Sequence, residues 1–342
     1  MTGGFTRLES ERAAGLCTYY PRAYGHGRFE VCDLIAGAGQ GYVLSVKDTW
    51  SGNTAVLKGM WWENQALVDL SRARAWLEPR TRELFRGLRA AAQATQLTQQ
   101  APAIIDVLRE PSPSLLAAGM RNPPEELFIV QRFVGHGATV AATLADQFEV
   151  RRAENKPFTE AELLDLADQL CNALGALHAA RRHNGANGTT YWIHADLKPE
   201  NILVIGPPWR YLLIDYEGAV EKGKPVEVTT EDYAPLRGNQ DSEYDQADQR
   251  FDLYMLGATL AEAAGLRRLS PQARSALYGT DKAAHLEARR ELAKLGYGPT
   301  LTNIITTCLA RPGYRLAQVA DVQHELARAR QNSALQRVLL RP

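Results

Sequence analysis

One polar stretch, followed by an apolar run that ends in an acid, constrains this chain more than any other feature. The stretch reads HADLKPEN from His194 to Asn201, and it places an acid, a fixed positive charge and an amide close together. The later run LLID ends in Asp215. Two acids and an amide supply the oxygen ligands that Mg²⁺ prefers, and phosphoryl transfer depends mainly on positioning and charge neutralisation. The pattern therefore predicts a site that holds magnesium on a polyphosphate and orients an attacking hydroxyl.

The ordered run H-x-D-x-K-P-E-N, with the apolar strand that ends in Asp215, resembles the catalytic loop and metal-binding segment of eukaryotic-type Ser/Thr protein kinases. The resemblance implies that Asp196 accepts the proton of the substrate hydroxyl and that Lys198 neutralises the transferring phosphate. It also implies that Asn201 and Asp215 hold Mg²⁺, that ATP is the phosphate donor, and that the substrate is a protein carrying Ser or Thr.

The resemblance extends over roughly residues 28–330, and a chain of 342 residues is long enough for two lobes. It implies an α+β, two-lobed protein-kinase-like fold, with ATP in the cleft between the lobes. The expected parts are an N-terminal extension at 1–27, a small β-rich lobe at 28–134, a larger helical lobe at 135–330 and a C-terminal tail at 331–342.

Short apolar runs predict the strands of the small lobe, at 29–35, 42–46, 54–58, 103–108 and 127–134. The third of them ends in Lys58, which the resemblance implies to bind ATP phosphates. The last resembles the strand that leads to the hinge between kinase lobes, with Gln131 at the back of the adenine pocket. The expected nucleotide-binding residues are Gly37, Gly39, Gly41, Val43, Lys58, Gln131 and Phe133.

The glycine-rich turn between the first two strands departs from the kinase pattern G-x-G-x-x-G-x-V. If Gly41 and Val43 are aligned with the pattern, alanines occupy its first two glycine positions. If Gly37 and Gly39 are aligned instead, the loop is one residue short. Glycines let backbone N–H groups approach phosphates without a Cβ in the way, so a looser grip on ATP is expected here.

Residues 61–96 have a helix-like pattern, and Pro79 is expected to start a helix because proline is tolerated at the first helical position. In the resembled kinases a glutamate of this helix pairs with the strand lysine. Glu78 and Glu83 both suit that role, and the sequence does not decide between them. The segment 111–124 carries four prolines and predicts an irregular connector.

In the expected large lobe, the sequence TEAE from Thr159 to Glu162 is a capping box that opens a helix. Leucines at helical spacing mark one face of this helix as core, and His178 at its end is interpreted as structural. A second helix begins near Phe251. By the resemblance it is the central buried helix of the lobe, in which Asp252 bonds the backbone of the catalytic loop.

Two further positions depart from the resembled family. Leu236 stands where a glutamate usually pairs with a buried arginine, here expected to be Arg315. Because a buried unpaired charge is costly, either Glu231 or Glu243 is expected to serve that arginine, or this end of the lobe is rearranged.

The other departure is Ala195, at the position of an arginine that a phosphate on the activation segment usually holds. Alanine cannot bind phosphate. The sequence therefore predicts activity that does not require phosphorylation of Thr229 or Thr230. The alternative is that Lys222 or Arg250 takes over the role of the missing arginine.

The composition bears on the partners and the cellular setting of the protein. The 39 basic and 39 acidic residues balance, so nothing predicts a nucleic-acid partner or an anionic membrane. The cysteines are scattered without metal or redox spacing, which favours a reduced, cytoplasmic setting. They are Cys17, Cys32, Cys171 and Cys308. No signal peptide and no apolar run of about 18 residues is present, so no membrane span is expected.

Two rival functions remain open. The sequence Asp215-Tyr216-Glu217 is also typical of small-molecule kinases of the aminoglycoside or choline type. Lys198 and the Ala234-Pro235 segment argue against that class. A non-catalytic pseudokinase is suggested by the altered glycine loop, Glu217 and Leu236. Against it, the four residues that kinase chemistry needs most are all present, namely Lys58, Asp196, Asn201 and Asp215.

Overall fold

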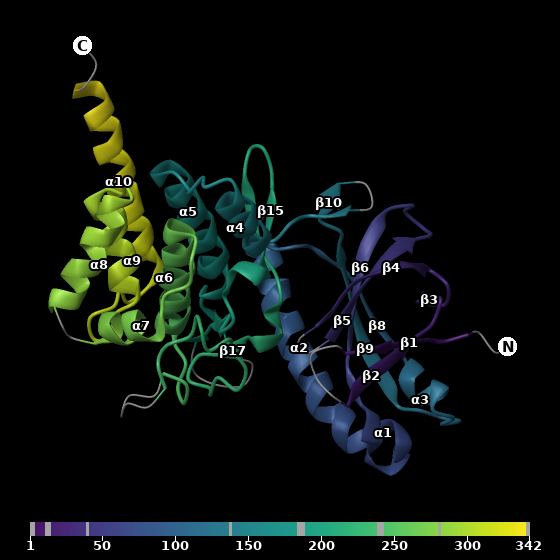
Figure 1. Cartoon of the computed structure of the whole chain (residues 1–342). Helices are drawn as coiled ribbons and strands as arrows, with labels where there is room; N and C mark the ends of the chain where they lie inside the picture. Colours follow the sequence, from purple (N-terminus) through teal and green to yellow (C-terminus); the bar gives the residue numbers. More distant parts are fainter. Residues whose placement is uncertain are drawn as a thin grey trace. The chain divides into compact units, whose positions relative to one another are not determined.

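The computed structural model describes residues 4–10, 15–38, 41–136, 139–182, 189–237, 243–279 and 282–339. The chain divides into two compact units. The first comprises residues 1–92 with 102–140, and the second comprises residues 93–101 with 141–342. The first unit carries most of the strands and the second most of the helices (Figure 1).

An antiparallel sheet of six strands forms the body of the first unit, in the order β3-β4-β5-β6-β9-β8. The strands are β3 (Ala23–Tyr24), β4 (Phe29–Ala38), β5 (Gly41–Asp48), β6 (Thr54–Met60), β8 (Ile104–Pro111) and β9 (Glu125–Arg132). The five strands expected from the sequence are thus present, with slightly different ends. Leu44, Leu57 and Val130 lie opposite one another on β5, β6 and β9 and are fully buried, so this face of the sheet forms a core.

The other face of the sheet packs against α2 (Ala73–Leu97). Ile129 of β9 joins Leu77 and Leu84 of the helix in one buried cluster. Two short helical turns, α1 (Asn64–Val68) and η1 (Leu70–Arg72), precede the helix. The sheet is therefore covered on this face by an element whose apolar side chains recur at helical spacing.

The prediction that Pro79 starts a helix is wrong, because α2 begins at Ala73 and Pro79 lies inside it. Proline removes one backbone hydrogen bond from a helix interior. Packing nevertheless fixes the turn before it. Ala73 and Leu77 are buried. Trp76 also stacks on Trp62, with ring centroids 4.6 Å apart. Tertiary contacts of the turn before the proline therefore outweigh its tendency to end a helix.

The proline-rich segment 111–124 is not wholly irregular, since it contains α3 (Pro113–Ala117). Ser112 caps this short helix by accepting a hydrogen bond from the Leu115 N–H. Pro113 occupies the first helical turn, where its missing N–H leaves no bond unmade. The prediction of an irregular connector is wrong for these residues because a serine cap and a proline together start a helix.

The described part of the N-terminal extension packs on the first unit. It supplies β1 (Thr6–Glu9) and β2 (Leu16–Tyr20), which form a small sheet with β7 (Trp62–Glu63). The hydroxyls of Thr18 and Ser114 lie 3.0 Å apart, and Ser114 also accepts the Tyr19 N–H at 2.9 Å. These contacts tie β2 to α3.

Helices dominate the second unit (Figure 1). They are α4 (Leu144–Ala153), α5 (Glu160–Leu177), α6 (Gln249–Gly265), α7 (Pro271–Tyr278), α8 (Lys282–Lys294), α9 (Pro299–Cys308) and α10 (Val319–Leu339). The predicted capping box of α5 is confirmed. Thr159 Oγ1 accepts the Glu162 N–H at 3.2 Å, and Glu162 Oε2 accepts the Thr159 N–H at 2.8 Å.

Helix α6 lies at the centre of the second unit. Every residue from Phe251 to Ala264 is buried. A Cβ added at Gly257 would lie 2.7 Å from Cβ of Cys308, so glycine allows α6 and α9 to approach closely. The helix is apolar on all sides except for a few polar residues, which is typical of an element inside a core.

Short strands of the second unit lie on either side of the loop from His194 to Asn201 along the chain. The hairpin β15 (Ile202–Ile205) and β16 (Arg210–Leu213) follows the turn η2 (Pro199–Asn201). β14 (Trp192–Ile193) pairs with β17 (Val220–Glu221), after the turn η3 (Tyr216–Gly218). A further short pair in the second unit is β12 (Arg181–Arg182) with β13 (Thr189–Thr190). The pair β10 (Gly135–His136) and β11 (Thr139–Val140) belongs to the first unit. Within the described ranges, no helix is both long and apolar enough to cross a membrane.

Candidate active site

The loop that begins at His194 is anchored by the buried carboxylate of Asp252 on α6. Oδ2 of Asp252 accepts the His194 N–H and Oδ1 accepts the Ala195 N–H, both at 2.8 Å. Oδ2 also lies 2.9 Å from Nε2 of His178, the residue that ends α5. The predicted contact of Asp252 with the loop backbone is confirmed, and His178 has the structural role expected of it.

Ala195 is held in a left-handed backbone conformation, with φ of 62°. This conformation costs an alanine roughly 1 to 2 kcal/mol. Its N–H and that of His194 both point to one carboxylate, and its side chain is fully buried. Charge-assisted bonds to backbone donors offset the strain, so Asp252 fixes the turn that presents Asp196.

The carboxylate of Asp196 accepts hydrogen bonds from several directions. Lys198 Nζ lies 2.8 Å from Oδ2, and Asn201 Nδ2 lies 3.0 Å from the same oxygen. Asn201 Nδ2 also donates to the backbone oxygen of Asp196 at 2.8 Å. The structure thus brings together the three loop residues that the sequence singled out, and it orients the carboxylate by two side-chain donors.

Thr230 completes these contacts and was not predicted as part of the site. Its N–H and its hydroxyl donate to Oδ1 of Asp196 at 2.9 and 2.8 Å. The same hydroxyl accepts from Lys198 Nζ at 2.7 Å. The sequence marked Thr230 as a possible phosphorylation site only. No local spacing could have assigned the contact, because it spans 34 positions of the chain.

The side chain of His194 connects the loop to the segment that leads to Asp215 by hydrogen bonds. The imidazole is fully buried, and desolvation lowers its pKa below the ordinary value, which favours the neutral ring. Nδ1 accepts the Asp196 N–H at 3.3 Å. Nε2 then carries the proton and donates to the Ile214 oxygen at 3.2 Å. A neutral histidine with this tautomer therefore joins the two segments.

Asp215 lies two residues after the end of β16 and adopts a left-handed conformation, with φ of 63°. The preceding residue, Ile214, donates its N–H to the Asn201 oxygen at 2.9 Å. This bond places the backbone at Asp215 beside the end of the loop. A strained conformation of a polar residue at such a position is typical of functional sites.

Asn201 and Asp215 offer a donor set that suits Mg²⁺. The amide nitrogen of Asn201 is used by Asp196, which leaves its amide oxygen to face a cation. Among the described residues, no group of three or more His, Cys, Asp or Glu could hold a metal ion. Magnesium does not need such a group, since it usually takes one or two carboxylates and completes its shell with phosphates and waters. The residues present therefore fit Mg²⁺ that arrives with a polyphosphate.

Three of the candidate nucleotide-binding residues of the first unit lie on one face of its sheet. Lys58 pairs with Val43 of β5 and with Ile129 of β9. Gln131 of β9 pairs with Val56, two residues before Lys58. Directly paired residues point to the same side of a sheet, and so do alternate residues of a strand. Val43, Lys58 and Gln131 therefore share the face that packs against α2. Phe133 follows directly after β9.

The glycines of the predicted phosphate loop have packing roles of their own. Gly37 pairs with Tyr42 and therefore points to the opposite face of the sheet from Val43. A Cβ on Gly41 would overlap the carbonyl oxygen of Gly59, so the close approach of β5 and β6 requires glycine there. Gly39 lies outside the described residues. Phosphate binding by these glycines stays a prediction.

The two glutamates proposed to pair with Lys58 differ in exposure. Both lie on α2 and both have an arginine partner on that helix. Glu83 lies 3.1 Å from Arg80 with its side chain 25% exposed, whereas Glu78 lies 3.4 Å from Arg82 with its side chain 68% exposed. The lower exposure of the Glu83 side chain places it nearer the sheet than Glu78, which favours Glu83 as the partner of Lys58.

Arg315 pairs with Glu243, because Leu236 replaces the glutamate that usually pairs with this arginine in the resembled kinases. Its guanidinium forms an ion pair with Glu243, one of the two acids considered from the sequence. It also donates to the backbone oxygens of Ala310 and Arg250, both at 2.7 Å. The side chain of Arg315 is fully buried, so these bonds are needed to satisfy its charge. The prediction of a replacement acid is confirmed for Glu243.

Comparison with known proteins agrees with part of the sequence interpretation. No protein-family model matches the chain. A segment of 86 residues, 25% of this chain, is 34% identical to the serine/threonine-protein kinase YabT of Bacillus subtilis. The match covers 22% of that protein's length. The similarity relates a quarter of this chain to a kinase.

Proposed function

We propose that this chain is an ATP- and Mg²⁺-dependent kinase that phosphorylates Ser or Thr hydroxyls of protein substrates, with an α+β, two-lobed protein-kinase-like fold. The observation that carries the proposal is the arrangement around Asp196. Lys198, Asn201 and Thr230 all bond its carboxylate. Asp252 fixes the backbone before it. A carboxylate oriented in this way, beside a fixed cation, suits proton removal from an attacking hydroxyl.

In the proposed reaction, the substrate hydroxyl oxygen forms a bond to the γ-phosphorus of ATP. The bond from that phosphorus to the β–γ bridging oxygen breaks, and ADP leaves. The hydroxyl proton passes to the carboxylate of Asp196, a contribution worth about 10²- to 10⁴-fold in rate. Lys198, 2.8 Å from Asp196, neutralises charge on the transferring phosphoryl oxygens.

Other residues would bind the nucleotide and the metal. Asn201 and Asp215 would hold Mg²⁺, which supplies charge neutralisation on the polyphosphate when bound. In the first unit, Lys58 would bind phosphate oxygens, and Gln131 and Phe133 would line the adenine site. The kinase-related segment shared with YabT supports phosphoryl transfer in general, and the choice of a protein substrate rests on the loop sequence and Lys198.

The alternative is a small-molecule kinase, which the sequence Asp215-Tyr216-Glu217 favours. The aromatic residue of that run has a structural explanation here. The Tyr216 hydroxyl donates to the Leu213 oxygen at 3.1 Å, and its ring packs edge-on against His194 with centroids 5.0 Å apart. An aromatic residue at this position therefore does not by itself indicate a small-molecule substrate.

The test is phosphate transfer from labelled ATP with Mg²⁺ to two sets of acceptors: Ser- and Thr-containing proteins, and small alcohols including aminoglycosides and choline. We expect label on Ser or Thr of proteins, and we expect Asp196→Asn to lose at least about two orders of magnitude while ATP still binds. Transfer to small alcohols alone would establish the alternative. A wild-type protein that binds ATP without transfer to either set would show a pseudokinase.

A further inference from the structure

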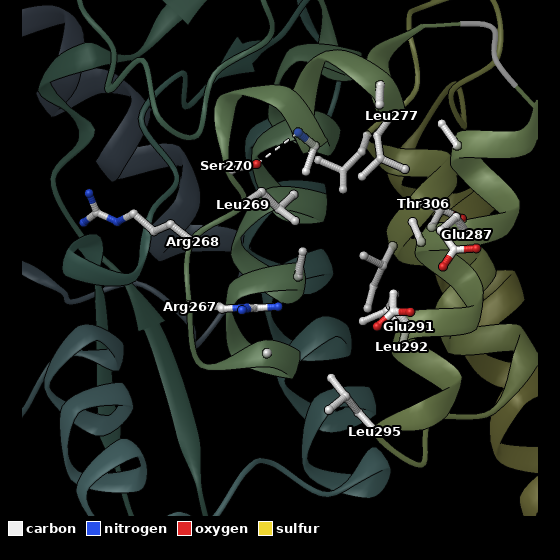
Figure 2. A pocket seen from close by; sticks show the side chains of 18 residues that line it. Arg267, Arg268, Leu269, Ser270, Leu277, Glu287, Glu291, Leu292, Leu295 and Thr306 are labelled. Atoms are coloured by element: carbon white, nitrogen blue, oxygen red, sulfur yellow. Dashed lines mark hydrogen bonds between the residues drawn. The ribbon is translucent and has the colours of Figure 1, made fainter.

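A cavity of about 550 Å³ lies in the second unit (Figure 2). Its lining includes neither Asp196 nor the residues that bond the Asp196 carboxylate. Its floor is formed by buried aliphatic side chains of α6 and α9, among them Ala261, Ile305 and Leu309. Leu277 of α7 and Leu292 of α8 also line the cavity. The volume is within the range of pockets that bind small molecules, about 300 to 1,000 Å³.

The polar groups in the lining are almost all satisfied by the protein itself. The Ser270 hydroxyl accepts the Ala273 N–H at 3.2 Å and so caps α7. The Thr306 hydroxyl donates to the Thr302 oxygen at 2.9 Å and accepts from Arg289 at 3.0 Å. The hydroxyls therefore call for no polar ligand, and the interior of the cavity suits an aliphatic group.

Helix α8 lies along this cavity without burying any residue of its own. Its residues Ala288 and Leu292 face the cavity, and Leu295 after its end is 51% exposed. A helix in a folded domain usually gains its stability from packing one apolar face. An aliphatic occupant would supply the contacts that this face lacks.

Two acids and Arg268 in the lining already have charged partners. Glu291 is paired with Lys294, and Glu287 lies 3.6 Å from Arg290. Arg268 points away from the cavity in Figure 2 and is paired with acids outside it, among them Glu200 at 2.8 Å.

Arg267 differs from these residues. In Figure 2 its side chain points into the cavity, in the direction of Glu291. In the part of the chain that the structure describes, no hydrogen bond joins it to another residue, although Glu291 is near enough for electrostatic attraction. A carboxylate at the mouth of the cavity could bond this guanidinium in a bidentate manner, which Glu291, already bonded to Lys294, does not do.

We propose that this cavity binds a single-chain amphiphile, whose aliphatic tail occupies the space between α7, α8 and α9 and whose carboxylate pairs with Arg267. The ligand class is thus a medium-chain fatty carboxylate. The inference is independent of the proposed phosphoryl transfer, since none of the lining residues belongs to that site.

The experiment is calorimetric titration of the full chain with laurate below its micelle concentration, beside dodecyltrimethylammonium, which has the same tail length and the opposite charge. We expect saturable one-to-one binding of laurate and none of the cation. Arg267→Gln should weaken laurate binding about tenfold, equivalent to about 1.4 kcal/mol. Its matched control is Arg328→Gln on α10, an exposed arginine outside the lining, which should bind laurate like the wild type.

Filling the cavity tests the position of the tail. Ala288→Trp on α8 should abolish laurate binding, whereas Ala293→Trp on the same helix, at an exposed position outside the lining, should not. Ala276→Trp, in the part of the lining that α7 supplies, repeats the test if the first variant does not fold. Circular dichroism checks the folding of each variant. Equal binding of both amphiphiles, binding unaffected by Arg267→Gln, or saturable binding that survives both cavity-filling changes would each overturn the proposal, as would no laurate binding to the wild type.

Discussion

The hydroxyl of Thr230 lies 2.8 Å from Oδ1 of Asp196, although 34 positions of the chain separate the two residues. The same hydroxyl accepts from Lys198, so one threonine joins the proposed base and its neighbouring cation. The segment that carries Thr230 is thereby tied to the loop that carries Asp196. Phosphorylation of this threonine would put negative charge against Asp196, which is unfavourable.

Thr230 is therefore predicted to position Asp196 rather than to serve as an activating phosphorylation site. Thr230→Ala removes two side-chain bonds, and we expect kcat to fall about tenfold, or about 1.4 kcal/mol in the barrier. Thr230→Ser keeps the hydroxyl and should retain most activity. Thr229→Ala is the matched control, because the Thr229 hydroxyl is buried without a hydrogen-bond partner among the described residues. Equal losses in Thr229→Ala and Thr230→Ala would contradict this role.

Activity is predicted not to require phosphorylation. Glu221, close to the start of the segment after Asp215, is bonded to Arg181 at 2.5 Å, and its backbone pairs with Trp192. These contacts hold the segment without a phosphate. Of the two cations that could replace the arginine missing at Ala195, Arg250 is bonded to Asp248.

The measurement is the activity of phosphatase-treated wild type toward an added substrate, compared with untreated protein. The two preparations should agree within about twofold, less than 0.5 kcal/mol in the barrier. A loss of tenfold or more that ATP pre-incubation restores would show that a phosphate-dependent switch is present. Replacing both Thr229 and Thr230 by alanine would not test this prediction, because the loss of the Thr230 hydroxyl also removes a hydrogen bond to Asp196.

Lys58→Met is predicted to abolish phosphate transfer while leaving the fold intact. Methionine retains most of the aliphatic length of lysine and removes the charge proposed to bind ATP phosphates. Lys58 lies on a central strand between two partners, and the strand pairing involves only its backbone. We expect the thermal midpoint to stay within a few degrees of wild type, as is usual for changes below about 1 kcal/mol. An unaltered turnover number would place the phosphate site elsewhere.

Glu83 is predicted to matter more than Glu78 for catalysis. Its side chain is the less exposed of the two and lies on the helix that packs against the face carrying Lys58. Glu83→Gln should lower kcat by about tenfold if it orients Lys58, a change of about 1.4 kcal/mol. Glu78→Gln, on the same helix and more exposed, serves as the control and should be close to wild type. The reverse order of effects would assign the pairing to Glu78.

Stability should fall with rising pH because of Glu126. Burial raises the pKa of this carboxyl from 4.5 to about 7, although Ser112 and Trp62 donate to Oε2. The folded state therefore keeps a proton that the unfolded state loses, and the contribution to stability is complete below pH 4.5 and is lost as the pH rises to about 7. The size of this loss is on the order of 3 kcal/mol.

Glu126→Gln is an uncharged substitute that can still accept both hydrogen bonds. Its unfolding free energy, measured by denaturant titration at several pH values, should match wild type near pH 4 and exceed it at pH 8. The difference between the two proteins isolates Glu126 from all other titrating groups. A difference that does not change between these pH values would show that the carboxyl is not protonated in the folded protein.

The local signals of the sequence identified the loop, the strands and the capping box, because each depends on residues close together in the chain. Asp252 and Arg315 were also found, although only through the resemblance to a family. The contact of Thr230 with Asp196 could not be found in this way, since neither residue type nor spacing indicates a bond between distant segments.

At Pro79 a local rule gave a wrong prediction. Proline favours the first turn of a helix, but tertiary packing places Pro79 inside α2. The proline lowers the stability of an isolated helix, but the stacked ring of Trp76 and the buried Leu77 hold the turn before it. The cavity beneath α8 is a third case. The sequence of α8 is helical, but only the arrangement of α6, α7 and α9 around it shows which of its apolar residues line the cavity.

The burial of helix α6 also limits which amino-acid substitutions this chain can accept during evolution. Because side chains on every side of the helix are buried, a polar or larger substitution almost anywhere from Phe251 to Ala264 meets the core. Helix α8 buries none of its residues, so its positions outside the cavity lining tolerate many replacements. Among diverging copies of this gene, the sequence of α6 should therefore drift slowly and that of α8 quickly, whichever reaction the protein performs.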